Sequence, residues 1–393
     1  MSRWHLITGE YPPGGGGIGD YTRLLAAALA ERGEAVDVWT SGRAPDGGPA
    51  PALADNGGAG NRKAPRVHRI PAFNRAGLRL LSAGLDAAPA PRRLLIQYAP
   101  QAMGMRGLNV AFCAWALARR RAGDDVRAMF HEPYFPFGWQ RPQRNLLAAI
   151  NRTMASLLLL ASTRAYVSTE AWIPLLRPLG PRHLRITTLP IPSTIPFVPQ
   201  PDAVRRTRER LLAGREGPLL VHFGTYGELI APMLIAALRE VARRRPSARV
   251  LLLGRGAPAF AQRLRALDAS TDVVTAGDRL SAEQISIHLQ AADAALQPYP
   301  DGADTRRTTL MACVANGVPT ATADGRFTDQ TWREGPIALV DAARPEDMAG
   351  AALDRLLAQP RDDMGERTKA FYEANFSMRL TVDRLLADGE AAP

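Results

Sequence analysis

The feature that most constrains the fold is the regular alternation of short apolar segments with longer helical patterns. Strand-length apolar runs occupy residues 4–8, 35–40, 67–70, 94–98, 126–130, 165–169 and 186–189. Helical patterns lie between many of them, over residues 20–32, 76–85, 109–121 and 141–164. This alternation predicts a mostly parallel sheet with helices on both faces. Ligands of such sheets collect at the carboxyl ends of the strands.

The same alternation resumes in the second half, with strand patterns at residues 219–223, 249–253, 273–275, 293–299 and 337–340. A length of 393 residues suits two domains. We expect an N-terminal Rossmann-like domain over 1–196 and a C-terminal one over 197–375, joined by the proline-punctuated segment 190–196 and facing a cleft. A helical tail, broken near residues 375–377, follows.

Composition bounds the class of protein. Hydrophobic residues make up 46% and charged residues 22%, as in ordinary globular proteins. The two cysteines, Cys113 and Cys313, lie in apolar helical patterns and predict buried thiols without a disulfide or metal cluster. The start lacks a signal-peptide pattern, and the longest apolar run, 154–162, is too short to cross a bilayer. We expect a cytoplasmic protein.

Charge is distributed unevenly. Residues 1–200 carry a formal charge of +12, whereas the remainder carries −1. The basic half predicts an anionic acceptor or peripheral association with a membrane. The alternative is that it only reflects an arginine-favouring composition, because the lysines of the chain are Lys63 and Lys369. The chain contains no zinc-finger pattern and no aromatic-basic RNA motif, which argues against nucleic acid as a partner.

A glycine-rich loop, residues 14–20, separates the first strand pattern from the first helix. Glycine backbones allow N–H groups to approach an anion closely. The loop does not match the dinucleotide fingerprint G-x-G-x-x-G, because Asp20 stands at its last position. The alternatives are an anion-binding loop and a purely structural turn.

His131 follows the strand pattern 126–130, where it could bond a sugar hydroxyl or merely satisfy the core. Tyr134 belongs to an aromatic cluster with Phe135, Phe137 and Trp139 that could stack on an acceptor or pack under a loop. The following helix, 141–164, mixes Arg with Leu and Ala. It could lie on an anionic membrane or pack on the sheet.

The passage 298–325 combines a strand end, a charged loop and a helix that begins near Thr308. Arg306 and Arg307 precede Thr308 and Thr309, so guanidinium groups, hydroxyls and free backbone N–H groups converge at one helix N-terminus. This pattern predicts a phosphate site, with a solvated charged loop as the alternative. Arg306 is the better placed arginine if Arg307 points outward.

Five motifs together resemble the GT-B glycosyltransferases of the large retaining family 4, also called group 1. They are Gly-Gly-Ile-Gly-Asp-Tyr at 16–21, the His131 strand end, Phe-Gly-Thr-Tyr-Gly at 223–227, Leu-Gly-Arg-Gly at 253–256 and the passage 298–319. The resemblance covers essentially the whole chain. It implies that the N-terminal domain binds the acceptor and the C-terminal domain a nucleotide-sugar, with a final helix in 376–393 crossing back to the first domain.

Two departures from the family concern the donor site. The family usually has two glutamates here, and the second binds ribose. Ala312 stands at the position of the second. Asp301 stands at the position of the first, with Asp304 as a second choice. The usual Arg/Lys pair after the first strand of the second domain is absent, because the loop from Thr225 carries no cation. Arg306 and Arg307 are the expected replacements.

These arguments predict a metal-independent hexosyltransferase of carbohydrate biosynthesis that uses a nucleoside diphosphate sugar and no cofactor. An epimerase of the same fold and an inactive donor-binding partner subunit are the alternatives. The predicted catalytic residues are His131, Asp301 and Arg306. The predicted donor and phosphate-binding residues are Gly16, Gly17, Thr225, Gly254, Arg279, Arg306, Thr308, Thr309 and Leu310. The predicted acceptor-binding residues are Asp20, Tyr21, Gln97 and Tyr134.

Overall fold

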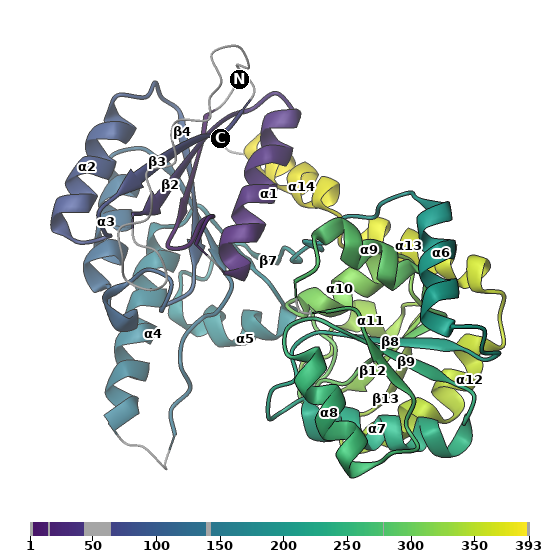
Figure 1. Cartoon of the computed structure of the whole chain (residues 1–393). Coiled ribbons are helices and arrows are strands. Elements are labelled where there is room, and N and C mark those ends of the chain that lie inside the picture. The colour runs from purple at the N-terminus through teal and green to yellow at the C-terminus, as the bar shows by residue number, and fades with distance from the viewer. Residues whose placement is uncertain (1–2, 15, 43–63, 139–142, 278, 391–393) are drawn as a thin grey trace. The chain divides into compact units, whose positions relative to one another are not determined.

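The structure, a computed structural model, describes residues 3–14, 16–42, 64–138, 143–277 and 279–390 (Figure 1). The chain divides into one unit of Met1–Pro190 with Thr381–Pro393 and a second unit of Ile191–Leu380. The sequence had led us to expect divisions after residues 196 and 375. Trp139 of the aromatic cluster lies outside the described residues.

A seven-stranded parallel sheet of order β3-β2-β1-β4-β5-β6-β7 forms the centre of the first unit. Its strands are β1 (Arg3–Thr8), β2 (Ala35–Ser41), β3 (Arg66–Ile70), β4 (Arg92–Tyr98), β5 (Asp125–Phe130), β6 (Arg164–Val167) and β7 (Ile186–Thr188). The register sets Thr8 opposite both Thr40 and Gln97, and Tyr98 opposite Phe130. Residues at the carboxyl ends of neighbouring strands are therefore neighbours in space.

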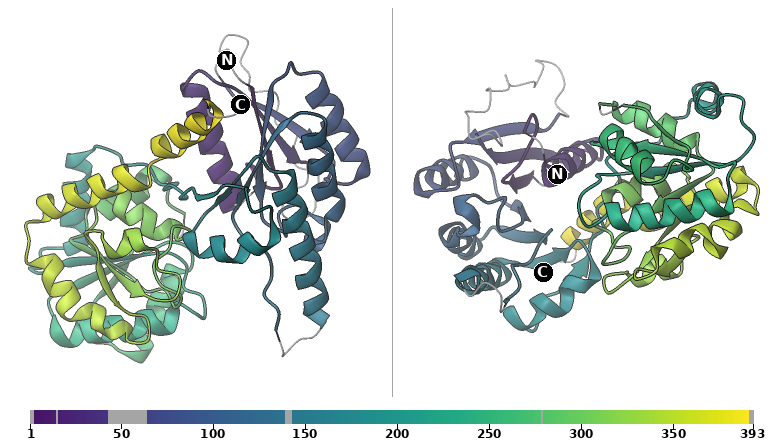
Figure 2. Two further views of the ribbon diagram at one scale, coloured as in Figure 1. Left: turned by 180° about the vertical axis from the view of Figure 1, so that it is seen from behind. Right: turned by 60° about the horizontal axis from the view of Figure 1, so that its bottom comes forward.

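Helices cover both faces of this sheet (Figures 1 and 2). The helices of the unit are α1 (Gly17–Glu31), α2 (Arg75–Asp86), α3 (Val110–Arg121), α4 (Gln143–Ala161), the short α5 (Ile173–Leu176) and α14 (Met378–Glu390). Helices α2, α3 and α4 lie on one face, and α1 and α14 lie side by side on the other, where Arg32 pairs with Asp383. Arg127 also donates to the carbonyl oxygen of Leu385 at 3.1 Å.

The second unit has a six-stranded parallel sheet of order β10-β9-β8-β11-β12-β13. Its strands are β8 (Leu219–Phe223), β9 (Arg249–Leu253), β10 (Val273–Thr275), β11 (Ala294–Gln297), β12 (Thr320–Asp324) and β13 (Ala338–Asp341). Its helices are α6 (Pro201–Leu212), α7 (Ala231–Arg244), α8 (Ala257–Leu267), α9 (Ala282–Gln290), α10 (Thr308–Ala315), α11 (Gln330–Arg333), α12 (Ala351–Leu357) and α13 (Arg361–Asn375).

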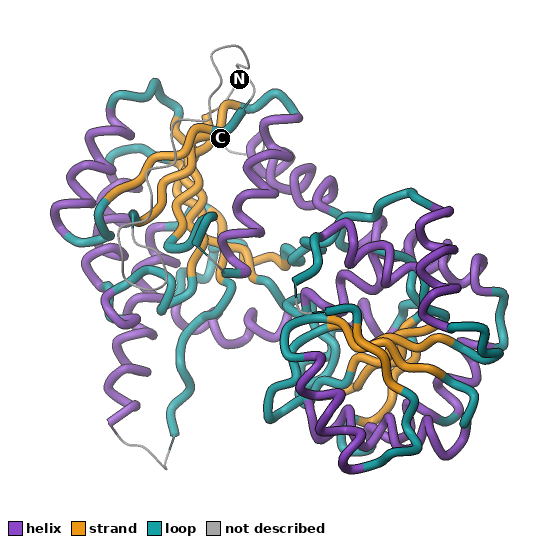
Figure 3. The backbone as a smooth tube through the Cα atoms, viewed as in Figure 1, coloured by secondary structure: helices purple, strands orange, loops and turns teal. Residues whose placement is uncertain are grey.

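Two apolar layers enclose the second sheet, whose strands form the central layer of the unit in Figure 3. Side chains of α7, α8 and α12 pack with Leu220 on one face, and side chains of α6, α9 and α10 pack with Val221 on the other. The alternation of Leu220 and Val221 between faces follows from the two-residue period of a strand. Both sheets are doubly wound, so the predicted fold class is confirmed.

Local sequence signals set several helix ends. Gly317, at φ +69°, follows the last residues of α10 and allows the chain to turn out of the helix. The predicted break near residues 375–377 is present, because α13 ends at Asn375 and α14 begins at Met378. Within the described ranges, every helix is too short or too polar to cross a membrane.

Candidate functional site

Each sheet has one point where the strand order reverses, between β1 and β4 in the first unit and between β8 and β11 in the second. The connections on either side of such a point run to opposite faces and leave a crevice at the carboxyl ends of the strands, where ligands bind. The glycine loop and Gln97 lie at the first reversal. Gly224 and the loop before α10 lie at the second. Several of the predicted site residues therefore lie at these two positions.

His131, Gln97 and Tyr21 come together in the first unit. The amide oxygen of Gln97 accepts a hydrogen bond of 2.7 Å from Nε2 of His131, and the Tyr21 ring meets the imidazole edge-on at 5.4 Å between centroids. Burial lowers the pKa of His131 to about 3, so the imidazole is neutral. With Nε2 protonated, Nδ1 is the basic atom.

The backbone of His131 is held as firmly as its ring. Its N–H donates to the carbonyl oxygen of Tyr98 at 2.9 Å. Its carbonyl oxygen accepts from Ser168 Oγ and Trp172 Nε1, each at 3.2 Å. We did not predict Ser168 and Trp172, because they follow β6 in sequence and only the adjacency of β5 and β6 brings them to His131.

A carboxyl group that the sequence analysis missed lies against the glycine loop. A Cβ on Gly16 would come within 1.9 Å of Glu10 Oε2, so a side chain at this position would require the flexible Glu10 side chain to shift. Burial raises the pKa of Glu10, and the charges of Glu132 and Asp20 raise it further. Carboxyl groups suit hydroxyl ligands. Diphosphate binding by Gly16 and Gly17 stays a prediction.

Tyr134 is held within the first unit. Its hydroxyl donates to the carbonyl oxygen of Leu175 at 3.1 Å, and the Arg152 guanidinium lies 4.1 Å from its ring centroid. Arg152 lies at 3.9 Å from the Phe137 ring as well. The side chains of Arg152, Tyr134 and Phe137 therefore pack on one another, which favours the packing alternative for this part of the aromatic cluster.

Two glycines bring the ends of β8 and β9 into close contact in the second unit. Gly254 has φ +103°, and a Cβ there would lie 2.2 Å from the carbonyl oxygen of Gly224. Thr225, next in the chain, is exposed. Arg279 is exposed after β10, the outermost strand on this side of the sheet, so the strand order separates it from the β8–β11 reversal.

Helix α10 begins at Thr308, as predicted, and Arg307 is its N-cap residue. The Thr309 hydroxyl lies 2.8 Å from the Tyr299 hydroxyl, which donates to Gln297 Oε1 at 3.1 Å. Leu310 is fully buried, so only its backbone N–H could serve a ligand. The first-turn N–H groups of an α-helix lack acceptors within the helix and favour an anion.

The side-chain contacts of the two arginines before α10 differ from the expectation. Arg306 is committed to Asp304, with Nε at 3.1 Å from Oδ1 and NH2 at 2.6 Å from Oδ2. Arg307 does not simply point outward, because its Nε is buried. Asp301 accepts from Arg326 Nε at 2.9 Å. Arg306 therefore pairs with the fully buried Asp304, and its assignment to the diphosphate stays a prediction.

His222, a second buried histidine, was not predicted. Its Nδ1 donates to the carbonyl oxygen of Leu296 at 2.8 Å, and burial lowers its pKa to about 4. Its Nε2 is buried and has no hydrogen-bond partner in the described ranges. The available signal was a histidine inside the apolar run 219–223 just before a glycine.

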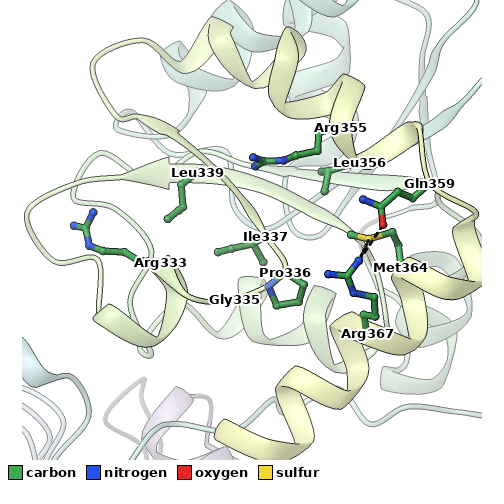
Figure 4. Close-up of a pocket in the computed structure, with 10 residues that line it drawn as sticks. All are labelled: Arg333, Gly335, Pro336, Ile337, Leu339, Arg355, Leu356, Gln359, Met364 and Arg367. Atoms are coloured by element: carbon green, nitrogen blue, oxygen red, sulfur yellow. Dashed lines mark hydrogen bonds between the residues drawn. The ribbon is translucent and has the colours of Figure 1, made fainter.

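A separate pocket of about 360 Å³ lies near β13, α12 and α13 (Figure 4). Its lining residues are Arg333, Gly335, Pro336, Ile337, Leu339, Arg355, Leu356, Gln359, Met364 and Arg367. None of the predicted site residues lines it, and β13 is an outer strand, two positions from β11 in the strand order. Among the described residues, no group of three or more His, Cys, Asp or Glu side chains could hold a metal ion.

Residues 16–192 match the family described as glycosyl transferase 4-like domain. No curated protein sequence matches the chain. Sucrose-phosphate synthase from Thermosynechococcus elongatus is similar over 100% of both chains, at 17% identity and a TM-score of 0.71. Anabaena HepE in complex with UDP and glucose is similar over 100% of both chains, at 13% identity and a TM-score of 0.64.

WaaG, a glycosyltransferase involved in lipopolysaccharide biosynthesis, is similar over 97% of this chain and 98% of its own, at 16% identity and a TM-score of 0.61. At these identities the solved structures show a shared fold, which is GT-B. The domain match and the fold together confirm the resemblance to family 4.

Proposed function

We propose that this chain, which has the GT-B fold and a glycosyl transferase 4-like domain over residues 16–192, moves a glycosyl group from a nucleoside diphosphate sugar to an acceptor hydroxyl. In this proposal the enzyme is a hexosyltransferase, works with retention of configuration and needs no metal ion. The observation that carries it is the second sheet's reversal point, where the N-terminus of α10 lies beside the glycine-lined ends of β8 and β9.

The second unit binds the donor in this proposal. Gly224 and Gly254 have no side chains, so a ligand can approach the backbone closely. Fixed dipoles and cations at α10 would stabilise the diphosphate as it leaves, which is the main electrostatic requirement of the reaction. Anabaena HepE has been solved with UDP and with UDP-glucose, which supports a nucleoside diphosphate as the ligand.

The first unit binds sugar and acceptor hydroxyls in this proposal. The neutral His131 would accept a hydroxyl proton in a hydrogen bond at Nδ1, while Gln97 holds Nε2. Asp20 and Tyr21 at the start of α1 would contact the acceptor, and Asp301 of the second unit a sugar hydroxyl. Carboxylates and neutral imidazoles are suited to hydroxyl groups because both accept hydrogen bonds.

Thermal shift tests the proposal at its first step. UDP, GDP and ADP are added to the full chain, and we expect one of them to raise the melting temperature, because a ligand that binds only the folded state stabilises it. The matching nucleotide-sugar is then assayed with hydroxyl acceptors, with and without EDTA. Stabilisation by none of the three would contradict the proposal. Product formation without acceptor would identify an epimerase.

A further inference from the structure

The pocket beside β13 is lined by three arginines and by apolar side chains (Figure 4). Its volume of about 360 Å³ lies near the lower end of the range for small-molecule sites, about 300–1,000 Å³. The lining contains no acidic side chain among the residues that the structure describes. Glu334 and Glu366, the sequence neighbours of Arg333 and Arg367, do not line it. The charged side chains of the lining are therefore all positive.

The floor of the pocket is apolar and comes from both faces of the sheet. Ile337 packs in a cluster with Trp332. Leu356 and Met364 pack in the layer that contains Leu220. Ile337, Leu356 and Met364 are 7%, 3% and 4% exposed, so they are core side chains whose outer surface the pocket reaches. Because β13 is the last strand on this side of the described sheet, no further strand separates the two layers there.

The wall that Gly335 forms is fixed against α13. A Cβ on Gly335 would lie 2.5 Å from Cζ of Phe371, so the backbone lies directly on that ring. The Trp332 ring stacks on Phe376 at 4.6 Å between centroids and meets Phe371 edge-on at 5.8 Å. These aromatic contacts hold the segment that leads into β13. The pocket is therefore formed in advance of any ligand, which lowers the cost of binding.

The three guanidinium groups differ in what they contact. Arg333 is paired with Asp324. Arg367 donates from NH1 to the neutral Gln359 amide oxygen at 3.0 Å, and no carboxylate of the described residues pairs with it. Arg355 makes no hydrogen bond or ion pair with any described residue. Two positive charges of the lining are therefore not neutralised by carboxylates of the described chain.

Figure 4 shows the side chains of Arg355 and Arg367 on opposite sides of Ile337. A guanidinium fork matches the oxygens of a carboxylate or a phosphate. Apolar side chains such as Ile337 favour an alkyl or aryl group, because its burial removes apolar surface from water. Charge alone would suit any anion, and an apolar floor alone would suit any hydrocarbon. The combination suits a molecule that has both parts.

We propose that this pocket binds a small amphiphilic anion. Its alkyl or aryl body would lie against Ile337, Leu356 and Met364, and its carboxylate or phosphate head would lie between Arg355 and Arg367. None of the predicted donor or acceptor residues lines the pocket, so this site is additional to those of the proposed function. The inference does not rest on that function.

Isothermal titration of the full chain tests the site with octanoate and octyl phosphate, each below the concentration at which it forms micelles. We expect at least one of them to bind with one molecule per chain, and the tighter of the two identifies the preferred head. Octanol, which lacks the charge, and acetate, which lacks the apolar body, should each bind at least about tenfold more weakly. Added salt should weaken binding, because exposed charges are screened.

Arg355→Gln and Arg367→Gln should each weaken binding at least about fivefold, because each removes one guanidinium contact. Arg355→Gln should leave the melting temperature unchanged, since the side chain has no partner among the described residues. Arg263→Gln is the matched control, at an exposed arginine of α8 outside the pocket lining, and should bind like the wild type.

The inference is overturned if neither amphiphile binds, or if both pocket variants bind like the wild type. Equal binding of octanol, or an equal loss in Arg263→Gln, would overturn it as well. A chain that binds an amphiphile but none of UDP, GDP and ADP would keep this inference and remove the proposed function.

Discussion

The carboxyl edges of the two sheets differ in the charged groups that lie against them. At the first edge Glu10 lies against Gly16, and its pKa is raised by burial and then by Glu132 and Asp20. At the second edge, Arg307 adjoins the N-terminus of α10. Residues 1–200 carry a formal charge of +12 and the rest −1, yet the group that lies against Gly16 is a carboxyl. The net charge of a domain therefore does not predict which charged group lies at its strand ends.

Part of the explanation is that arginines of the first unit serve its own structure. Arg92 donates to Asp124 at 2.7 Å, and Arg119 donates to the second oxygen of the same carboxylate at 2.6 Å. Arg127 lies 2.8 Å from Asp125. These cations neutralise acidic groups within the unit and are not available to a ligand. An anionic acceptor or membrane partner for the basic half remains a prediction.

Because the two edges contact different parts of the substrates in the proposed function, a substitution at the first edge should lower turnover more than nucleoside diphosphate affinity. His131→Ala should lower turnover at least about a hundredfold, while nucleoside diphosphate affinity changes less than about threefold, because the histidine belongs to the hydroxyl-binding edge. Steady-state kinetics and isothermal titration measure the two effects. His183→Ala, at an exposed histidine of the same unit, is the control. A large fall in melting temperature with His131→Ala would favour a core role for the imidazole.

The end of β9 should be sensitive to the addition of a side chain. Gly254→Ala should destabilise the protein by about 2–4 kcal/mol, because a Cβ at φ +103° would lie 2.2 Å from the Gly224 oxygen. Gly227→Ala, where no atom lies within 4 Å of the added Cβ, should cost far less. Chemical denaturation measures both. Equal losses would show that the β8–β9 contact does not limit stability.

The edges share one property, a neutral buried histidine. Burial lowers the pKa of His131 to about 3 and of His222 to about 4, whereas in the unfolded chain each has a pKa near 6.5. The unfolded chain therefore binds more protons below about pH 6.5, and each histidine should reduce stability as the pH falls, by about 1.4 kcal/mol per pH unit.

Urea denaturation of the wild type, His131→Gln and His222→Gln between pH 5 and 7 measures this effect. Each substitution should flatten the acid side of the profile by a similar amount, because each removes one titrating group. A profile that flattens in only one variant would show that the two histidines do not share this property.

The smallest effect is expected at Glu10. Its raised pKa means that ionisation at pH 7 costs stability, which is recovered when the carboxyl is protonated. Glu10→Gln should therefore raise the melting temperature by about 1–2 °C at pH 7, and the gain should fade as the pH drops toward the ordinary pKa of glutamate. A lower melting temperature at pH 7 would mean that a partner stabilises the carboxylate.

Several site relationships followed from sequence because parallel strands end at a common edge. Tyr21, Gln97 and His131 are far apart in the chain, yet each was placed at a strand or helix end and they meet in the first unit. Glu10 and His222 were missed because nothing in their sequence neighbourhoods shows which backbone or side chain will lie against them. The pairing of Arg306 with the buried Asp304 was missed for the same reason.

The sequence by itself determined the two doubly wound sheets, the start of α10 and the break before α14, because periodicity, glycines and helix-end signals act over a few residues. Tertiary structure alone decided that Arg306 pairs with the buried Asp304, that Nε2 of His222 has no hydrogen-bond partner among the described residues, and that the Glu10 carboxyl lies against Gly16. Those outcomes depend on contacts within about 4 Å between segments distant in the chain, and local patterns do not encode such distances.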